Sequence, residues 1–426
     1  MANNPKHIFS ALLACVATLV ATSCSTTKGV PEGDQLYVGL TKIKYSNYED
    51  NSHFSSTQEE MEAALGCAPN GAFMGSSYYR TPFPISLWVW NAFSESTSGA
   101  GKWISKTFGK PPVLMSWVNP ALRASVAQNT LKNNGYFQGR VKYEVLTQKN
   151  PKKAKIGYSV SVGPLYTLDS VAYLNFPPEI TQLIASRASI SKLQKGSPFS
   201  VSSLDTERNR ISNLLRDNGY YYYQPGYSSF LADTIQVPQK VQLKMLPTAT
   251  MPETAKRRWY VGKIDFYLRK QMGETLTDSV KRKRLTVYYN GKRSPIRSRI
   301  LMRNIMLRPE HMYRYRDENL TSTKLMDMGL FSMTDFKFTP RDTTSLADTL
   351  DLSITGLLDK PYDFYVETNY TGKTNGRMGP ALIVGLTRRN AFRGAEKLDI
   401  NVYGSYEWQT GHSANGAAAQ MQSYEY

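Results

Sequence analysis

One short pattern recurs three times along the chain: a leucine, three further residues, a glycine and two apolar residues that are mostly aromatic. The copies cover residues 131–137, 215–221 and 325–331. The residues before each glycine have a helical period, and glycine suits the left-handed conformation that ends many helices. Alternating strands precede and follow each helix, so the chain should fold as a row of units with the order strand, helices, strand, strand. The strands predicted before the helices cover 36–45, 166–174 and 259–268, and those after them include 140–146, 156–162, 241–246 and 350–354.

The composition allows several packed domains. The 426 residues are 41% hydrophobic and 12% aromatic, which excludes disorder throughout the chain. The four histidines and three cysteines show no HExxH or CxxC spacing, and the sequence has no GxSxG motif or phosphate-binding loop. We therefore expect no metal site, no cofactor and no catalytic residues, and we expect that the protein is not an enzyme.

The N-terminus is typical of an export signal. An apolar run over residues 8–20 is too short to span a membrane, and small residues lead from it to Cys24. A cysteine at this place resembles a lipobox, in which the thiol is acylated. Ala21 stands where the usual leucine would be, and Ala21 with Ser23 would also serve ordinary signal cleavage. We expect lipidation of Cys24, which would leave Cys67 as a free thiol, interpreted as a small buried hydrophobe.

After Pro361 the sequence changes to long alternating strands with glycine-rich turns. Strands of about ten residues with an apolar face that ends in Tyr and Trp suit the wall of a transmembrane β-barrel. A soluble antiparallel sheet with one wet face alternates in the same way, and alternation alone does not separate the two. The predicted apolar faces comprise Phe364, Val366 and Tyr370, then Leu382, Val384 and Leu386, then Ile400, Val402, Tyr406 and Trp408.

The repeated order and the Gly-Tyr-Phe helix end resemble the polypeptide-transport-associated (POTRA) domain. Residues 390–398 resemble the turn between the first barrel strands of the outer-membrane barrel-assembly superfamily (BamA/TamA-like), whose members place POTRA domains before a closed barrel. Residues 24–33 and 109–114 resemble segments of its lipid-anchored translocation-and-assembly branch. The resemblance covers nearly the whole chain after the signal.

The resemblance implies a fold class of α+β POTRA repeats (β-α-α-β-β) followed by the first strands of an antiparallel transmembrane β-barrel. A barrel in lipid must close, because unpaired edge groups cost several kcal/mol each. The last segment provides roughly three or four strands, so we expect a C-terminally truncated chain that ends within a strand at 423–426; assembly from several chains is the alternative. The expected segments are a signal peptide at 1–23, POTRA-like domains at 24–163, 164–248 and 256–357, and the start of the barrel at 361–426.

Most of the net charge of +18 lies in one segment. Residues 256–316 contain 18 Lys and Arg against four acids. By repeat order this segment is a basic insert in the last POTRA-like unit, so anionic lipid headgroups or acidic partner segments are the expected counter-charges. A solvated surface is the alternative, and the export signal argues against nucleic acid. The predicted basic surface is Lys281, Arg282, Lys283 and Arg284.

An aromatic insert lies in the first repeat. Residues 73–117 contain four of the six tryptophans, together with Tyr78, Tyr79 and Phe83. This density would suit a membrane interface or a surface that grips a partner. It would equally suit the core of an enlarged domain, and both interpretations stay open.

An exposed edge of a POTRA sheet can bind an extended polypeptide by strand addition, through backbone hydrogen bonds that do not depend on its side chains. The resemblance implies that the first barrel strand then opens laterally and templates client strands into the membrane. The expected client edges carry Arg140, Val141, Tyr143, Val145, Tyr221, Tyr223, Phe336 and Phe338, and the expected gate strand carries Phe364, Val366, Thr368 and Tyr370.

The expected function is therefore outer-membrane protein assembly or translocation in a diderm bacterium, with the POTRA domains in the periplasm. The implied partners are unfolded outer-membrane or secreted polypeptides, outer-membrane lipids and a periplasm-spanning partner. A dedicated secretion pore and a lipid-anchored periplasmic scaffold without a barrel are the alternatives.

Overall fold

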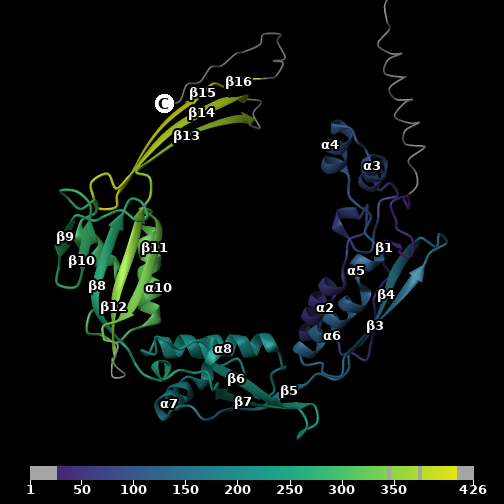
Figure 1. Cartoon of the computed structure of the whole chain (residues 1–426), viewed down its shortest axis with the longest axis horizontal. Helices are drawn as coiled ribbons and strands as arrows, with labels where there is room; N and C mark the ends of the chain where they lie inside the picture. The colour runs from purple at the N-terminus through teal and green to yellow at the C-terminus, as the bar shows by residue number, and fades with distance from the viewer. Residues whose placement is uncertain (1–25, 343–346, 373–376, 410–426) are drawn as a thin grey trace, which may run out of the picture. The chain divides into compact units, whose positions relative to one another are not determined.

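The computed structural model describes residues 26–342, 347–372 and 377–409 (Figure 1). By its internal contacts the chain forms two compact units. Unit 1 comprises residues 1–174, 189–207 and 230–246, and unit 2 comprises 175–188, 208–229 and 247–426. The middle repeat therefore contributes segments to both units. Cys24 and the strand predicted at 423–426 lie outside the described residues.

The first sheet of unit 1 is built around β4 (Lys153–Ser161). β1 (Leu36–Leu40) and β2 (Lys44–Ser46) pair in parallel with successive halves of β4, and β3 (Arg140–Thr147) pairs antiparallel on the other side. The prediction of one strand over 36–45 is therefore wrong. The register of β1 against β4 shifts between Tyr37 and Leu40, and Gly39 in this stretch has a φ of +116°.

Helices α2 (Ser52–Leu65) and α6 (Pro120–Asn133) pack on this sheet. The Asn51 side chain caps α2 by accepting a hydrogen bond from the Phe54 N–H (2.8 Å). Asn119 caps α6, and Pro120 favours its first turn. The apolar faces of both helices meet the inward residues of the strands. This core includes Tyr37, Leu40, Phe54, Met61, Leu65, Ala127, Leu131, Ile156, Tyr158 and Val160.

Four short helices form an insertion between α2 and α6. They are η1 (Phe73–Gly75), α3 (Ile85–Phe93), α4 (Gly99–Phe108) and α5 (Met115–Val118). α3 and α4 contact each other as a helical hairpin. A separate small core attaches α3 to the segment that leads into β1, and it consists of Val30, Leu36, Val38, Leu87 and Leu114.

The second sheet has the strand order β5–β7–β6. β5 (Thr167–Tyr173) runs parallel to β7 (Lys240–Pro247), and β6 (Ser228–Asp233) forms the other edge. In unit 1, Leu204 at the start of α8 packs against the core of this sheet, which consists of Leu168, Leu193, Phe199, Val241 and Leu243. The repeat also contains α7 (Pro178–Ser186), η2 (Ala188–Ile190), α8 (Val201–Arg216) and η3 (Pro225–Tyr227).

The main sheet of unit 2 has five strands in the order β11–β12–β8–β10–β9. β8 (Tyr260–Arg269) lies in the centre, parallel to β12 (Thr349–Leu358) and β10 (Thr286–Tyr289). The edges are the antiparallel strands β11 (Phe331–Pro340) and β9 (Asp278–Lys281). The β9–β10 hairpin was not predicted from the sequence, and it carries the basic run.

α9 (Ser298–Asn304) and α10 (Tyr315–Asp327) pack on this sheet, and η4 (Glu253–Lys256) precedes it; Figure 1 shows α10 beside β11 and β12. The core between them includes Val261, Ile264, Phe266, Leu268, Leu301, Leu325, Leu352 and Ile354. Among the described residues, no helix combines the length and the apolarity that crossing a membrane requires.

A second antiparallel sheet follows in unit 2. β14 (Arg377–Arg389) pairs with β13 (Tyr362–Gly372) on one side and with β15 (Lys397–Ser405) and β16 (Trp408–Gln409) on the other. The strand predicted over 399–409 is thus interrupted between β15 and β16. In Figure 1 the three long strands curve side by side.

The repeated glycine is left-handed in all three copies, with a φ of +88° at Gly135, +96° at Gly219 and +62° at Gly329. Helices α6, α8 and α10 end just before these residues, which confirms the predicted helix ends. A Cβ on Gly135 would lie 2.9 Å from the Phe199 oxygen, and one on Gly219 would lie 2.9 Å from Met312 Cγ, whereas Gly329 has open space. The first two glycines therefore also permit a close approach of the segment that follows.

The aromatic residues after the glycine explain that close approach. In the first copy Tyr136 belongs to the core of the first sheet, while Phe137 packs against the core of the second sheet with its ring 5.0 Å from that of Tyr166. In the second copy the Tyr221 ring lies 4.9 Å from that of Phe338 and packs against the core of unit 2. The motif thus ends a helix and also forms a joint, in which an aromatic side chain of one repeat packs against the core of the next repeat.

Candidate functional site

The first open edge is β3, which pairs with β4 alone among the described strands. The Ile156 carbonyl of β4 accepts a hydrogen bond from the Thr41 N–H, so its backbone groups point away from β3. Val145 is the partner of Ile156 in the register, and Tyr143 lies two residues before it. Because backbone groups alternate along an antiparallel pair, the N–H and C=O groups of Tyr143 and Val145 point out of the sheet and can pair with another strand.

The side chains of this edge form an apolar margin. Tyr143 and Val145 lie on the core face, opposite Tyr158 and Ile156, yet they are 46% and 37% exposed, because α6 contacts β3 without covering these two side chains fully. A strand added to β3 would therefore extend both the backbone ladder and the apolar face. All four residues predicted for this edge, Arg140, Val141, Tyr143 and Val145, lie on β3.

The prediction that Tyr221 and Tyr223 lie on an edge strand is wrong. Tyr221 and Tyr223 lie in the turn after α8 rather than on a strand. Tyr223 is buried, and Tyr221 is half-buried against the core of unit 2. The edge strand of the second sheet is β6, which begins at Ser228 and exposes Leu231.

Phe336 and Phe338 lie on β11, which pairs with β12 alone among the described strands. Their rings are half-buried against the core of unit 2 and are not directed outward. This edge therefore offers backbone groups rather than an apolar margin.

The sheet β13–β15 has one contiguous apolar face. The antiparallel register places apolar residues of the three strands directly opposite each other, which confirms that the predicted faces coincide. Phe364 is 68% exposed and Val402 67%, so no described element covers this face. Two rows cross the sheet, formed by Phe364, Leu386 and Ile400 and by Val366, Val384 and Val402.

The opposite face of this sheet is polar. The Tyr365 hydroxyl donates to Asn401 Oδ1 (3.1 Å), and the Asn369 amide donates to Glu367 (2.7 Å). β13 pairs with β14 alone among the described strands, so the predicted gate residues lie on an edge strand. They are Phe364, Val366, Thr368 and Tyr370.

The turn between β14 and β15 docks on the loop before α9. Asn390 Nδ2 donates to the Pro295 carbonyl (2.9 Å), and Arg393 Nε donates to the Ser294 carbonyl (3.0 Å). The Arg297 N–H in turn donates to the Arg393 carbonyl (2.9 Å). This turn lies in the segment 390–398 that resembles the family turn, and here it attaches the second sheet of unit 2 to the main sheet.

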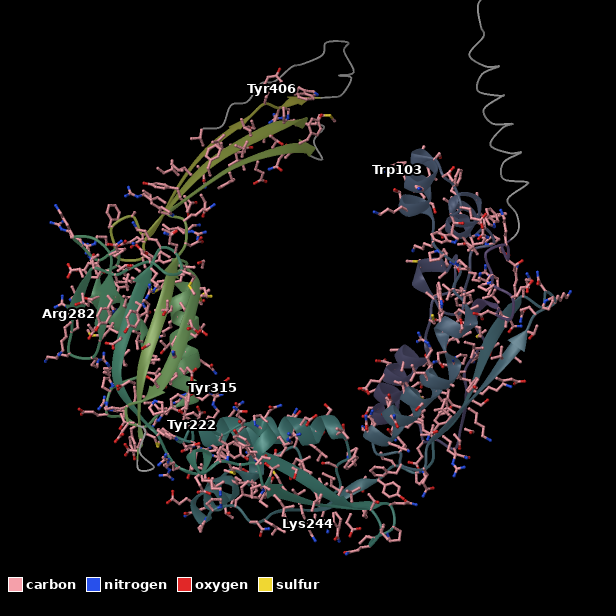
Figure 2. The ribbon with its side chains drawn as sticks, viewed as in Figure 1. Trp103, Tyr222, Lys244, Arg282, Tyr315 and Tyr406 are labelled. Atoms are coloured by element: carbon pink, nitrogen blue, oxygen red, sulfur yellow. The ribbon has the colours of Figure 1, made fainter. Side chains whose placement is uncertain are left out.

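The predicted basic surface lines a cavity of about 300 Å³ beside β8. Lys281, Lys283 and Arg284 form no ion pair with another described residue, whereas Arg282 Nε donates to Ser298 Oγ (3.1 Å). Figure 2 shows Arg282 on the outer hairpin of the sheet. Lys263 and Arg341 also line the cavity, and Glu310 is its one acidic residue. The sequence prediction missed Lys263 and Arg341 because they lie on other segments.

The sequence analysis also missed a joint between α8 and α10. Arg216, the last residue of α8, donates to the Tyr313 hydroxyl (3.2 Å), lies 3.7 Å from Glu318 Oε2 and stacks 3.8 Å above the Tyr315 ring. Tyr222 and Tyr315 mark this place in Figure 2. Burial, and next the Glu318 carboxylate, raise the pKa of Tyr313 far above its ordinary value, so its hydroxyl stays a donor to Glu318. No local motif reveals this cluster, because Arg216 is about a hundred residues before the other three members.

No group of three or more His, Cys, Asp or Glu side chains is placed to hold a metal ion within the part of the chain that the structure describes. Cys67 is a half-buried free thiol. The arrangement offers surfaces for association: open strand edges, an apolar sheet face and a basic cavity.

No family model matches the chain, and no curated protein matches it. Among solved structures, the chain is similar to POTRA3–5 of Haemophilus influenzae BamA, with 14% identity and a TM-score of 0.36 over 77% of this chain and 99% of that one. It is also similar to Haemophilus ducreyi BamA lacking POTRA domains 1–3 (14%, TM-score 0.37, 57% and 39% covered) and to CdiB from Acinetobacter baumannii (13%, 0.27, 59% and 40%).

The chain spans about two fifths of the length of the last two structures.

Proposed function

We propose that the protein is an outer-membrane assembly or translocation factor of the BamA/TamA-like superfamily. POTRA-like domains at 24–163, 164–248 and 256–357 would take up unfolded polypeptides in the periplasm, and the strands from residue 361 would belong to a membrane barrel. The single observation that carries the proposal is the sheet β13–β15, with its uncovered apolar face and its polar opposite face.

Physical chemistry favours lipid as the environment of that face. Apolar side chains left in water lose the favourable free energy of burial, and the largest exposed patches of soluble proteins mark interaction sites. The 11 residues of β13 match the length that a tilted strand needs to cross a bilayer. The polar face would then line the barrel interior.

Strand addition supplies the client site. The outward N–H and C=O groups of Tyr143 and Val145 on β3 suit the backbone of any extended chain, and the apolar margin suits the alternating side chains of a barrel strand. Uptake and insertion change no covalent bond, so the mechanism requires no nucleophile, general base or cofactor.

The membrane attachment has two further parts. Acylation of Cys24 would anchor the N-terminus in the outer membrane. The basic cavity at Lys281, Lys283 and Arg284 would bind anionic headgroups or an acidic segment of a partner.

A proline placed on β3 tests the client site. Val145→Pro removes an outward N–H but no bond to β4, so the sheet should stay intact. One lost backbone hydrogen bond should weaken binding of an extended barrel-strand peptide about fivefold, measured by fluorescence anisotropy with the full chain in detergent.

Val145→Thr is the matched control, because it retains the N–H and the β-branched shape and should bind like the wild type. Equal affinity for Val145→Pro and the wild type would contradict strand addition at β3. Thermal unfolding of both variants checks that the fold is retained.

A further inference from the structure

The α3–α4 hairpin carries apolar side chains on its outside. On α4 the residues that face the protein are Gly101 and Ser105, whereas Trp103 is 61% exposed and its ring meets that of exposed Phe108 at 5.8 Å. A helix at a water-exposed surface normally directs its apolar side chains toward the core and its small or polar residues toward water, and α4 does the reverse. Figure 2 shows Trp103 on the hairpin. The insertion also exposes Phe73, Met74, Tyr79, Phe83, Ile85 and Trp117.

The charges of this insertion are almost all positive. Lys102, Lys106 and Lys110 are exposed, and Glu95 is the one acid between residues 73 and 117. Exposed Trp and Phe next to lysines are typical of segments that lie in the headgroup region of a membrane. Anionic phospholipid is the partner whose charge and apolar interior match both sets of residues.

Gly29 and Val30 lie against the same hairpin. A Cβ on Gly29 would be 2.9 Å from Asn91 Oδ1 of α3, and Val30 shares a buried cluster with Leu87 of α3. Cys24 is five positions before Gly29, so their Cα atoms are at most about 18 Å apart. An acyl chain on Cys24 would therefore bring a bilayer within reach of α3 and α4.

We propose that the α3–α4 hairpin binds the surface of an anionic phospholipid bilayer, with Trp103 and Phe108 at the headgroup boundary and Lys102 and Lys106 near the phosphates. This inference rests in part on the proposed acylation of Cys24 and deepens it. The first POTRA-like domain would be attached to the membrane by an acyl chain and by an aromatic hairpin. Neither a soluble client nor the core of the domain is needed to explain the exposed aromatic residues.

The test uses the full chain with Cys24→Ser, so that no acyl chain contributes, and with the other two cysteines also replaced by serine. A fluorescent label on Trp103→Cys reports contact with vesicles of phosphatidylethanolamine and phosphatidylglycerol that contain spin-labelled quencher lipid. We expect quenching at this position. We expect none for the same label on Glu59→Cys, an exposed position of α2.

Replacing the two lysines tests the electrostatic part of the proposal quantitatively. Lys102→Ala with Lys106→Ala should reduce partition into the anionic vesicles about thirtyfold, because each lysine at such a surface contributes a factor of about five. Both residues are exposed, so the substitutions should not affect folding, and thermal unfolding checks this. Partition unchanged by the double substitution would overturn the electrostatic part of the proposal.

The sheet β13–β15 could bind the vesicles independently, so a label on Val366→Cys is the second control. Quenching at residue 366 without quenching at 103 would overturn the proposal, because the chain would then be bound through the sheet alone. Failure of palmitate to label Cys24 in cells would contradict the proposed acylation only, since the vesicle test uses a chain without it.

Discussion

Replacing Asn390 is expected to release the β14–β15 turn from the loop before α9. The side chain donates to the Pro295 carbonyl (2.9 Å) and accepts from the Ala395 N–H (3.2 Å), and Asn390 itself has a left-handed φ of +56°. Two lost hydrogen bonds at about 1 kcal/mol each, plus about 1 to 2 kcal/mol for alanine in this conformation, give roughly 3 to 4 kcal/mol for Asn390→Ala.

Hydrogen exchange measures this loss locally. The Arg297 N–H is protected by its bond to the Arg393 carbonyl, so its exchange reports opening of the turn. A loss of about 3 kcal/mol corresponds to exchange that is faster by somewhat more than a hundredfold. The assay follows peptides that contain residues 294–300 by mass spectrometry.

Two variants separate the contributions. Asn390→Gly loses both hydrogen bonds but tolerates the positive φ, so exchange should rise only about thirtyfold. Asn369→Ala removes an exposed side chain on β13 that bonds Glu367, and it should leave the turn unchanged. Unchanged protection of Arg297 in Asn390→Ala would refute the docking of the turn through Asn390.

Two other predictions concern the joints between repeats. Gly135→Ala should lower the free energy of unfolding, measured in urea, by about 3 kcal/mol, because the alanine would have a positive φ and its Cβ would meet the Phe199 oxygen. Gly329→Ala has a positive φ but open space, so it should lower the free energy of unfolding by only about 1 kcal/mol. Equal losses in the two variants would contradict the close approach at Gly135. Arg216→Ala should cost about 2 kcal/mol through its partly buried contacts, and a double-mutant cycle with Glu318→Gln should show coupling. Additive losses in that cycle would show that the two side chains act independently.

The features that depend only on neighbouring residues could be predicted from the sequence. The repeated glycine follows the end of a helix in all three copies, because a residue without Cβ adopts the left-handed backbone at no steric cost. Alternation along β13, β14 and β15 determined which residues share the apolar face, because the side-chain period of a strand is two.

The same local signals failed where a side chain serves a distant core. The tyrosines after Gly219 have the β-propensity of an edge strand, yet Tyr221 packs beside Phe338, more than a hundred residues away. The basic run was evident in the sequence, but the β9–β10 hairpin that joins it to Lys263 and Arg341 in one cavity was not.

The sequence by itself therefore determined the repeating units, their helix ends and the two faces of the last strands, since backbone conformation and side-chain period depend on neighbouring residues. Only the tertiary structure decided which edges stay open, which aromatic residues join successive repeats and which lie exposed on the α3–α4 hairpin. These properties depend on long-range packing, and no periodicity along the chain encodes which surface another element will cover.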